Sequence, residues 1–264
     1  LDYEKNKLIW AKNYKIPFRS NLKILDNKLV IADINNSLYF IDKTDGSKLK
    51  SIPTEDTLIK NNFTNSLALI NESLYYLNTY GSLYSVNKNG RVRWFINLNQ
   101  SMDINPSNLF NSKPILLHKS KLIISTDLYL YLIDLNSGST LSKIAITSLL
   151  KPIVSGENLF LITKDNFLVC ININNSKIIY SVDLNQNVAD FLGVKKKKSI
   201  NIKTLLLVNN DLLLFLKNSY LVKLNLKGKI KEISKLNSKI NSLPILINES
   251  LIYFDKKNKL IISN

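Results

Sequence analysis

One pattern recurs along the whole chain: two short apolar runs with alternating polar residues, joined by a tight turn. It reads "NKLVIADINNSLYFIDKTDG" at residues 27–46, and five variants follow. Alternation with a period of two on both sides of a turn predicts an antiparallel β-hairpin in each copy. A second leucine stands nine positions before the aligned one in five copies and eight positions before it in one, at Leu122. The aligned leucines, each the first apolar residue after the turn, are Leu38, Leu83, Leu130, Leu168, Leu221 and Leu260.

A further apolar run lies before the hairpin and another lies after it. Proline introduces the earlier run at Pro114, Pro152 and Pro244, where a residue without an N–H suits the start of a strand. Four strands in 44 residues, the 264 residues divided by six copies, are typical of one blade of a β-propeller. A helical solenoid does not fit a period of two, and the strands of a β-sandwich need not recur in fours.

The repeat therefore predicts an all-β propeller of four-stranded antiparallel blades, with six repeats visible plus a partial N-terminal one, or six to eight blades in all. We expect residues 1–264 to form a single propeller domain, which would lack N-terminal blades if the sequence is a fragment. The opening "LDYEKNKLIW" aligns with "IDKTDGSKLK". Residues 7–13 are accordingly expected to form an outer strand beside the hairpin that contains Leu260, which would remove an exposed sheet edge.

The net charge of the chain is strongly positive. It holds 36 Lys and Arg against 20 Asp and Glu, a formal charge of +16, which would suit nucleic acid, anionic lipid or an acidic protein. The excess is mostly lysine, scattered through turns in a chain rich in Asn and Ile, the pattern that A+T-rich codons produce, so we predict no nucleic-acid partner. The one dense run is predicted to be a solvated loop or a contact for an anionic partner: Lys195, Lys196, Lys197 and Lys198.

No arrangement of residues indicates catalysis or a metal site. Cys170 is the only cysteine and is expected to be a small buried hydrophobic side chain. His118 is the only histidine and is expected to be an exposed turn residue rather than a general base. Glycine-rich phosphate loops and Ser/His/Asp patterns are absent. The sequence predicts a protein that is not an enzyme, with no catalytic residue, no metal and no cofactor.

Acidic and amide side chains recur at one position of the repeat. Because a residue repeated at a fixed position serves the repeat, these side chains are predicted to cap turns by accepting hydrogen bonds from the following backbone. They are Asp42, Asn87, Asp134, Asn172 and Asn225.

The sequence offers no membrane segment. Its apolar stretches fall far short of the roughly 18 residues that a membrane span needs, and the opening residues lack the pattern of a signal peptide. We therefore expect membrane association only through a lipid anchor or a partner outside this sequence.

Two tryptophans end a repeat in the same way. Trp10 and Trp94 each stand four residues after a turn residue, in the predicted fourth strand. Together with third strands such as "LYFID", this ending resembles the repeat of the pyrroloquinoline-quinone (PQQ) type propellers. A flat ring there can dock between neighbouring blades. The equivalent positions elsewhere hold Lys50, Ser142, Ile179 and Glu232.

Within that superfamily the chain resembles the BamB family, the propeller lipoprotein of the outer-membrane β-barrel assembly machinery. The likeness extends over the whole chain as repeats and is sharpest in "NSLPILINESLIYFDKKNKLIISN". It implies a non-enzymatic scaffold, periplasmic and associated with the outer membrane, that assists the assembly and insertion of β-barrel proteins. The implied partner is a barrel-assembly protein.

The family grips that partner with a Leu-x-Leu-Arg motif in a long loop. The counterpart here is "NLNQSMDINPSNLFNSKP", residues 97–114, and the resemblance places the partner contact at Met102, Ile104 and Asn105, without the arginine. Leu109 and Phe110 are expected to tuck under the next blade. The alternative function is that of a PQQ-like propeller that binds a small molecule, or an acidic partner through its basic loops.

Overall fold

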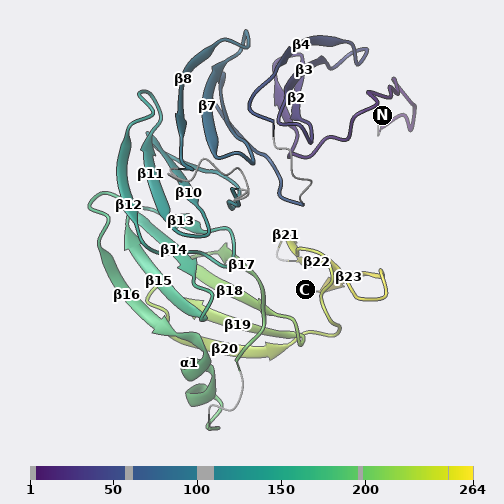
Figure 1. Cartoon of the computed structure of the whole chain (residues 1–264). Helices are drawn as coiled ribbons and strands as arrows, with labels where there is room; N and C mark the ends of the chain where they lie inside the picture. Colours follow the sequence, from purple (N-terminus) through teal and green to yellow (C-terminus); the bar gives the residue numbers. More distant parts are fainter. Residues whose placement is uncertain (1–3, 57–61, 100–109, 196–198, 249, 264) are drawn as a thin grey trace. The chain divides into compact units, whose positions relative to one another are not determined.

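The computed structural model describes residues 4–56, 62–99, 110–195, 199–248 and 250–263. The described chain is all-β apart from one short helix (Figure 1). Its strands form five four-stranded antiparallel sheets and one three-stranded sheet, which confirms the predicted propeller blades. The chain divides into two compact units, Leu1–Ile146 and Thr147–Asn264. The single domain over residues 1–264 stays a prediction.

Unit 1 contains three sheets, and in each of them neighbouring strands follow one another along the chain. Each sheet is therefore one sequence repeat. The first sheet consists of β1 (Lys23–Leu25), β2 (Lys28–Ala32), β3 (Leu38–Asp42) and β4 (Lys48–Ile52). The second consists of β5 (Ser66–Ile70), β6 (Ser73–Leu77), β7 (Ser82–Asn87) and β8 (Val92–Asn97). The third consists of β9 (Leu116–His118), β10 (Lys121–Ser125), β11 (Leu130–Asp134) and β12 (Thr140–Ile144).

Unit 2 contains the remaining sheets and the helix α1 (Leu184–Phe191). The fourth sheet consists of β13 (Ile153–Ser155), β14 (Asn158–Ile162), β15 (Phe167–Asn172) and β16 (Ile178–Asp183). The fifth consists of β17 (Ile202–Val208), β18 (Asp211–Leu216), β19 (Tyr220–Asn225) and β20 (Ile230–Lys235). The sixth consists of β21 (Ile245–Ile247), β22 (Ser250–Phe254) and β23 (Leu260–Ser263).

The sixth sheet has three strands in the part of the chain that the structure describes. Residues 8–14 have no regular secondary structure. The outer strand predicted over residues 7–13, with Trp10 in it, is therefore not formed over residues 8–14. The pairing of this segment with the hairpin of Leu260, which belongs to the other unit, stays a prediction.

The register of the central hairpins explains the spacing of the repeated leucines. Leu38 faces Ala32 across the hairpin, and residues 33–37 connect the two strands. In the third sheet Ser125 faces Leu130, so the connection, residues 126–129, is one residue shorter. Because the connection is shorter, Leu122 stands eight rather than nine positions before the aligned leucine Leu130. The first four aligned leucines are fully buried, and the last, Leu260, is 55% exposed.

The turn between the third and fourth strands of a sheet, here called the outer turn, is closed by the predicted capping side chains. Asp42 accepts a hydrogen bond from the backbone N–H of Thr44 at 2.7 Å, and Asp134 accepts from that of Ser137 at 2.8 Å. The amides at the same position do likewise, for example Asn87 from Arg91 at 2.9 Å. The capping prediction is confirmed at all five positions, including Asn172 and Asn225.

Four side chains, each four residues after a turn residue with positive φ, contact an outer turn that comes later in the chain. The ring of Trp94 lies on Gly138, and its Nε1 donates to the carbonyl of Leu135 at 3.2 Å. Trp10 lies on Gly46 in the same way and donates to the carbonyl of Lys43 at 2.9 Å. These contacts confirm the docking role predicted for the two tryptophans; we call them outer-strand contacts.

Two other residue types make the same contact where tryptophan is absent. Lys50 lays its alkyl chain on Gly90 and donates from Nζ to the Gly90 carbonyl at 2.7 Å. Tyr180 lies against Gly228, and its hydroxyl donates to the carbonyl of Leu226 at 2.6 Å. The assignment of Ile179 to this position was wrong by one residue.

The cause of that error is the turn before β16. Its left-handed residue is Ser176, with φ of 60°, where most other outer turns have glycine. Four residues beyond Ser176 is Tyr180, which pairs with Cys170 directly after the register shift of its strand, as Trp94 pairs with Ser85 directly after the shift in β8. Ile179 is instead 53% exposed.

Candidate partner-binding site

The predicted partner-contact residues Met102, Ile104 and Asn105 lie outside the described residues, as do Leu109 and Lys196–Lys198. The structure does describe the two ends of the long connection, Asn99 and Phe110, and it describes Lys195 as exposed. The geometry of those ends shows where the connection leaves and rejoins the fold.

Both ends of the connection rest on one turn, that between β6 and β7. The amide of Asn99 donates to the carbonyl of Tyr80 at 3.3 Å, and the backbone N–H of Phe110 donates to the carbonyl of Thr79 at 3.0 Å. The Phe110 ring is half-buried against the core that the second and third sheets share, which confirms that it tucks under the next blade. We call Asn99, Phe110 and the turn of residues 78–82 the loop base.

Gly81 lets the two ends approach the turn this closely. Its φ of 97° is a conformation that side chains with a Cβ rarely adopt. A Cβ on Gly81 would lie 2.6 Å from the Cβ of Asn99 and 2.9 Å from the Cδ2 of Phe110. The loop base therefore depends on glycine for both backbone conformation and space.

A carboxylate also binds the turn between β6 and β7 and the start of β7. Glu55 accepts hydrogen bonds from Asn78 Nδ2 at 3.0 Å, Ser82 Oγ at 2.9 Å and the Tyr84 hydroxyl at 2.7 Å. Asn78 in turn accepts from the backbone N–H of Ser82 at 2.9 Å. Burial by itself raises the pKa of Glu55, but the three donors outweigh it and hold the pKa below its ordinary value. Glu55 thus stabilises, as an anion, the turn that carries the connection.

The lowered pKa of Glu55 leads to a prediction about acid stability. Because the folded-state pKa lies below the unfolded one, the stabilisation is fully present above the unfolded pKa of about 4.3 and is lost as the pH falls through the folded pKa. Glu55→Gln is expected to lower the free energy of unfolding at pH 7 and to flatten its decline between about pH 5 and pH 3. Urea unfolding at several pH values measures both effects. Glu232→Gln, which changes an exposed carboxylate on β20, should retain the parental pH profile, and an unchanged profile for Glu55→Gln would contradict the assignment.

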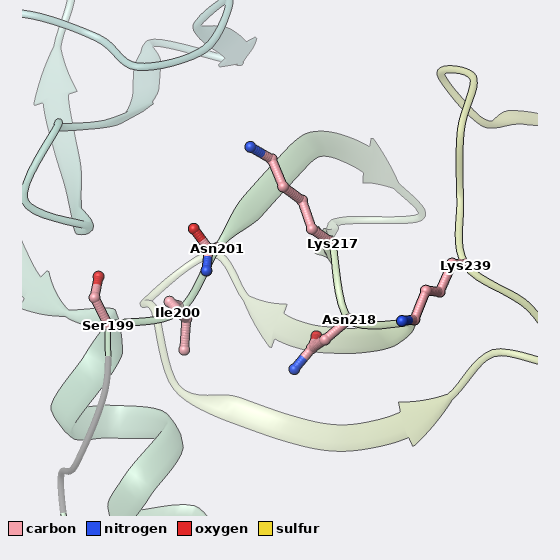
Figure 2. A pocket seen from close by; sticks show the side chains of 6 residues that line it. All are labelled: Ser199, Ile200, Asn201, Lys217, Asn218 and Lys239. Carbon is pink, nitrogen blue, oxygen red and sulfur yellow. The ribbon is translucent and has the colours of Figure 1, made fainter. Parts of the chain in front are cut away.

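A second candidate surface lies in unit 2, at the start of β17. An open pocket of about 570 Å³ combines two ammonium groups with a hydroxyl and two amides. Such groups suit an anion. Figure 2 shows, however, that the Lys217 and Lys239 side chains extend in different directions, so their ammonium groups do not converge on one point. The pocket is lined by Ser199, Ile200, Asn201, Lys217, Asn218 and Lys239.

The single cysteine and the single histidine both lie in or at the end of a strand. Cys170 is fully buried on β15, as predicted, and burial raises the pKa of its thiol to about 11. His118 ends β9 and is half-buried, so the prediction of an exposed turn residue was wrong. Among the described residues, no three His, Cys, Asp or Glu side chains gather as metal ligands. No helix in the described ranges has the length and apolar character to cross a membrane.

Sequence reasoning missed Glu55, Gly81 and α1. Glu55 follows β4 in a segment without repeat character, so nothing in its spacing marks it. The signal for α1 was present: Asp183 precedes Leu184 and Val188, the pattern of a helix cap followed by apolar residues four apart.

Comparison with known proteins places the chain in a family. A solved structure, BamB from Moraxella catarrhalis, matches 96% of this chain and 74% of its own chain with a TM-score of 0.74 at 12% sequence identity, which confirms the fold. The search of curated proteins gave no match. The family model described as outer membrane protein assembly factor BamB, of PQQ-like repeats, matches residues 1–182. More than half of the chain is thereby included, and the chain belongs to the BamB family.

Proposed function

We propose that this protein is a non-enzymatic interaction scaffold that assists the assembly and insertion of β-barrel proteins into the outer membrane. The observation that carries the proposal is the loop base, in which one blade holds both ends of a long connection. This connection lies within residues 1–182, which the family model matches. Fixing the two ends in this way lowers the conformational freedom that the connection would lose on binding, which favours recognition of a partner.

The partner in this proposal is a barrel-assembly protein, bound through Met102 and Ile104 as apolar anchors. Asn105 adds a polar contact, which is weaker than that of an arginine because an amide lacks the paired donors of a guanidinium. The protein would act in the periplasm, associated with the outer membrane, and its membrane attachment would come from a lipid anchor or from the partner.

The proposal includes no catalytic step. The one thiol is buried and its pKa is raised, so Cys170 is unsuited to nucleophilic or redox chemistry. The acidic side chains at the repeat position are occupied with backbone N–H groups of their own turns.

A pull-down from the native cell envelope tests the proposed function. The whole chain serves as bait, and a matched bait replaces residues 100–109 with a Gly-Ser linker of equal length. The parent is expected to recover a barrel-assembly protein, and the matched bait is expected to recover much less of it. Recovery of the same protein by both baits would contradict the assignment of the connection, and recovery of no assembly protein by either would contradict the function.

The pocket of unit 2 favours a second candidate, an acidic partner bound through basic loops. Lys217 and Lys239 at the pocket and the exposed Lys195 supply the positive charge. Such binding should weaken steeply as salt is added, whereas binding through Met102 and Ile104 should not. A small-molecule ligand such as a quinone has less support, because the polar groups of this pocket do not converge.

A further inference from the structure

The end of helix α1 in unit 2 combines apolar side chains with lysine. The helix itself is fixed to its unit. Asp183 caps it by accepting from the backbone N–H groups of Asn185 and Gln186 at 2.9 and 3.2 Å. Leu184 and Val188 are buried in the core of the fourth and fifth sheets. Figure 1 shows α1 leaving the end of β16 with its last turn beyond the strands of that sheet.

The residues that end the helix do not join this core. Phe191, Leu192 and Val194 are 48%, 53% and 56% exposed, and Lys195 beside them is exposed as well. We call these four residues the tip patch. The sequence continues with three more lysines and has no Asp or Glu from residue 191 to residue 210. The carboxylate that directly precedes the patch in the sequence, Asp190, accepts a hydrogen bond from Gln186 Nε2 at 2.6 Å.

The size of the tip patch argues against a protein partner. Three large apolar groups exposed within four residues are unfavourable in water unless something covers them. Half-exposed side chains of this kind offer roughly 300 Å² together, whereas each partner of a stable protein interface contributes about 800 Å². A bilayer needs no matching surface, because apolar side chains can enter the acyl boundary while lysines stay at the level of the phosphates.

We propose that the tip patch inserts into the surface of an anionic lipid bilayer. The apolar side chains supply the insertion, and Lys195 supplies attraction to negatively charged headgroups. This places a membrane contact within the chain itself, in addition to any anchor or partner outside it, and it does not depend on the proposed barrel-assembly partner.

Sedimentation of the whole chain with lipid vesicles tests the proposal. Binding is expected to vesicles that mix phosphatidylglycerol with phosphatidylcholine, and it should be weaker to phosphatidylcholine alone and at high salt. Phe191→Ser with Leu192→Ser should reduce binding about tenfold or more, since two apolar side chains no longer leave water. Leu243→Ser, which removes a 67% exposed leucine elsewhere in the same unit, should bind like the parent.

A fluorescent variant separates insertion from surface attraction. Phe191→Trp is expected to shift its emission to shorter wavelength on mixed vesicles, after subtraction of the signal of the parent protein. Lys195→Ser should lower the affinity and make it less sensitive to salt. An unshifted emission, or binding that the serine pair at 191 and 192 leaves intact, would overturn insertion. Failure to bind vesicles, with binding to an acidic protein instead, would overturn the lipid proposal altogether. Because these assays contain no barrel-assembly protein, they leave the proposed function untouched.

Discussion

Replacing Met102 and Ile104 together with alanine is expected to weaken binding to a barrel-assembly partner at least about tenfold. In the sequence the two residues stand between the ends of a connection that rest on the loop base. Truncating a buried interface anchor commonly costs on the order of 1 to 4 kcal/mol. Because the loop base itself is unaltered, thermal unfolding should be nearly unchanged. Titration calorimetry with the purified partner measures the affinity, and a melting curve measures the stability.

Two comparisons make this result specific. Ser101→Ala with Ser107→Ala changes small polar residues of the same connection and should bind normally. Gly81→Ala should instead disturb the loop base, since the new Cβ would overlap Asn99 and Phe110; it should reduce both affinity and stability. Normal binding by the Met102 and Ile104 double variant, or its unfolding, would show that this connection is not the binding surface.

Trp94→Ala is expected to lower the free energy of unfolding by roughly 2 to 4 kcal/mol. The ring is half-buried against Gly138, donates to the carbonyl of Leu135 and packs 5.9 Å from the ring of Tyr75, centroid to centroid. Its removal leaves a gap between the second and third sheets and takes from the Leu135 carbonyl one of two hydrogen bonds, the other being donated by the Tyr75 hydroxyl at 3.1 Å. Urea unfolding followed by circular dichroism measures the loss.

A neighbouring residue provides the control for Trp94. Val92 lies on the same strand and is 45% exposed, so Val92→Ala should cost less than about 1 kcal/mol. Gly138→Ala should be destabilising as well, because its φ of 75° disfavours a Cβ and that Cβ would lie 2.6 Å from the Trp94 ring. If Trp94→Ala is no more costly than Val92→Ala, the outer-strand contact does not hold the sheets together.

The sequence was most informative where one interaction repeats. The alternation around Leu38 and Leu83 predicted the central hairpins, because the period of a strand is local and tolerates few alternatives. The capping role of Asp42 and its counterparts followed from their recurrence. Ile179 was misassigned because Ser176 adopts a left-handed conformation that is commoner for glycine or asparagine, and the residue count began one position too early.

The candidate site was predictable only in part. The length of the connection marks residues 97–114 as unusual, and Phe110 could be assigned to the next blade from its apolar character. Glu55 could not be found, since its three donors come from a turn and a strand more than twenty residues away and only folding brings them together. Lys50 was also unforeseen in a docking role, because its alkyl chain rather than its charge covers Gly90.

The outer-strand contacts also bear on how the chain acquires its structure during synthesis. In every one of the four, the side chain precedes the carbonyl that it binds, by 33 to 46 residues. The side-chain contact from the last strand of a newly made blade therefore forms only after the outer turn of the next blade has been synthesised. The separations are short enough for rapid closure, so order should spread from the N-terminus in steps of one repeat. A chain that stops after β8 would leave Trp94 without its acceptor, whereas one that continues through Gly138 would hold the second sheet fully.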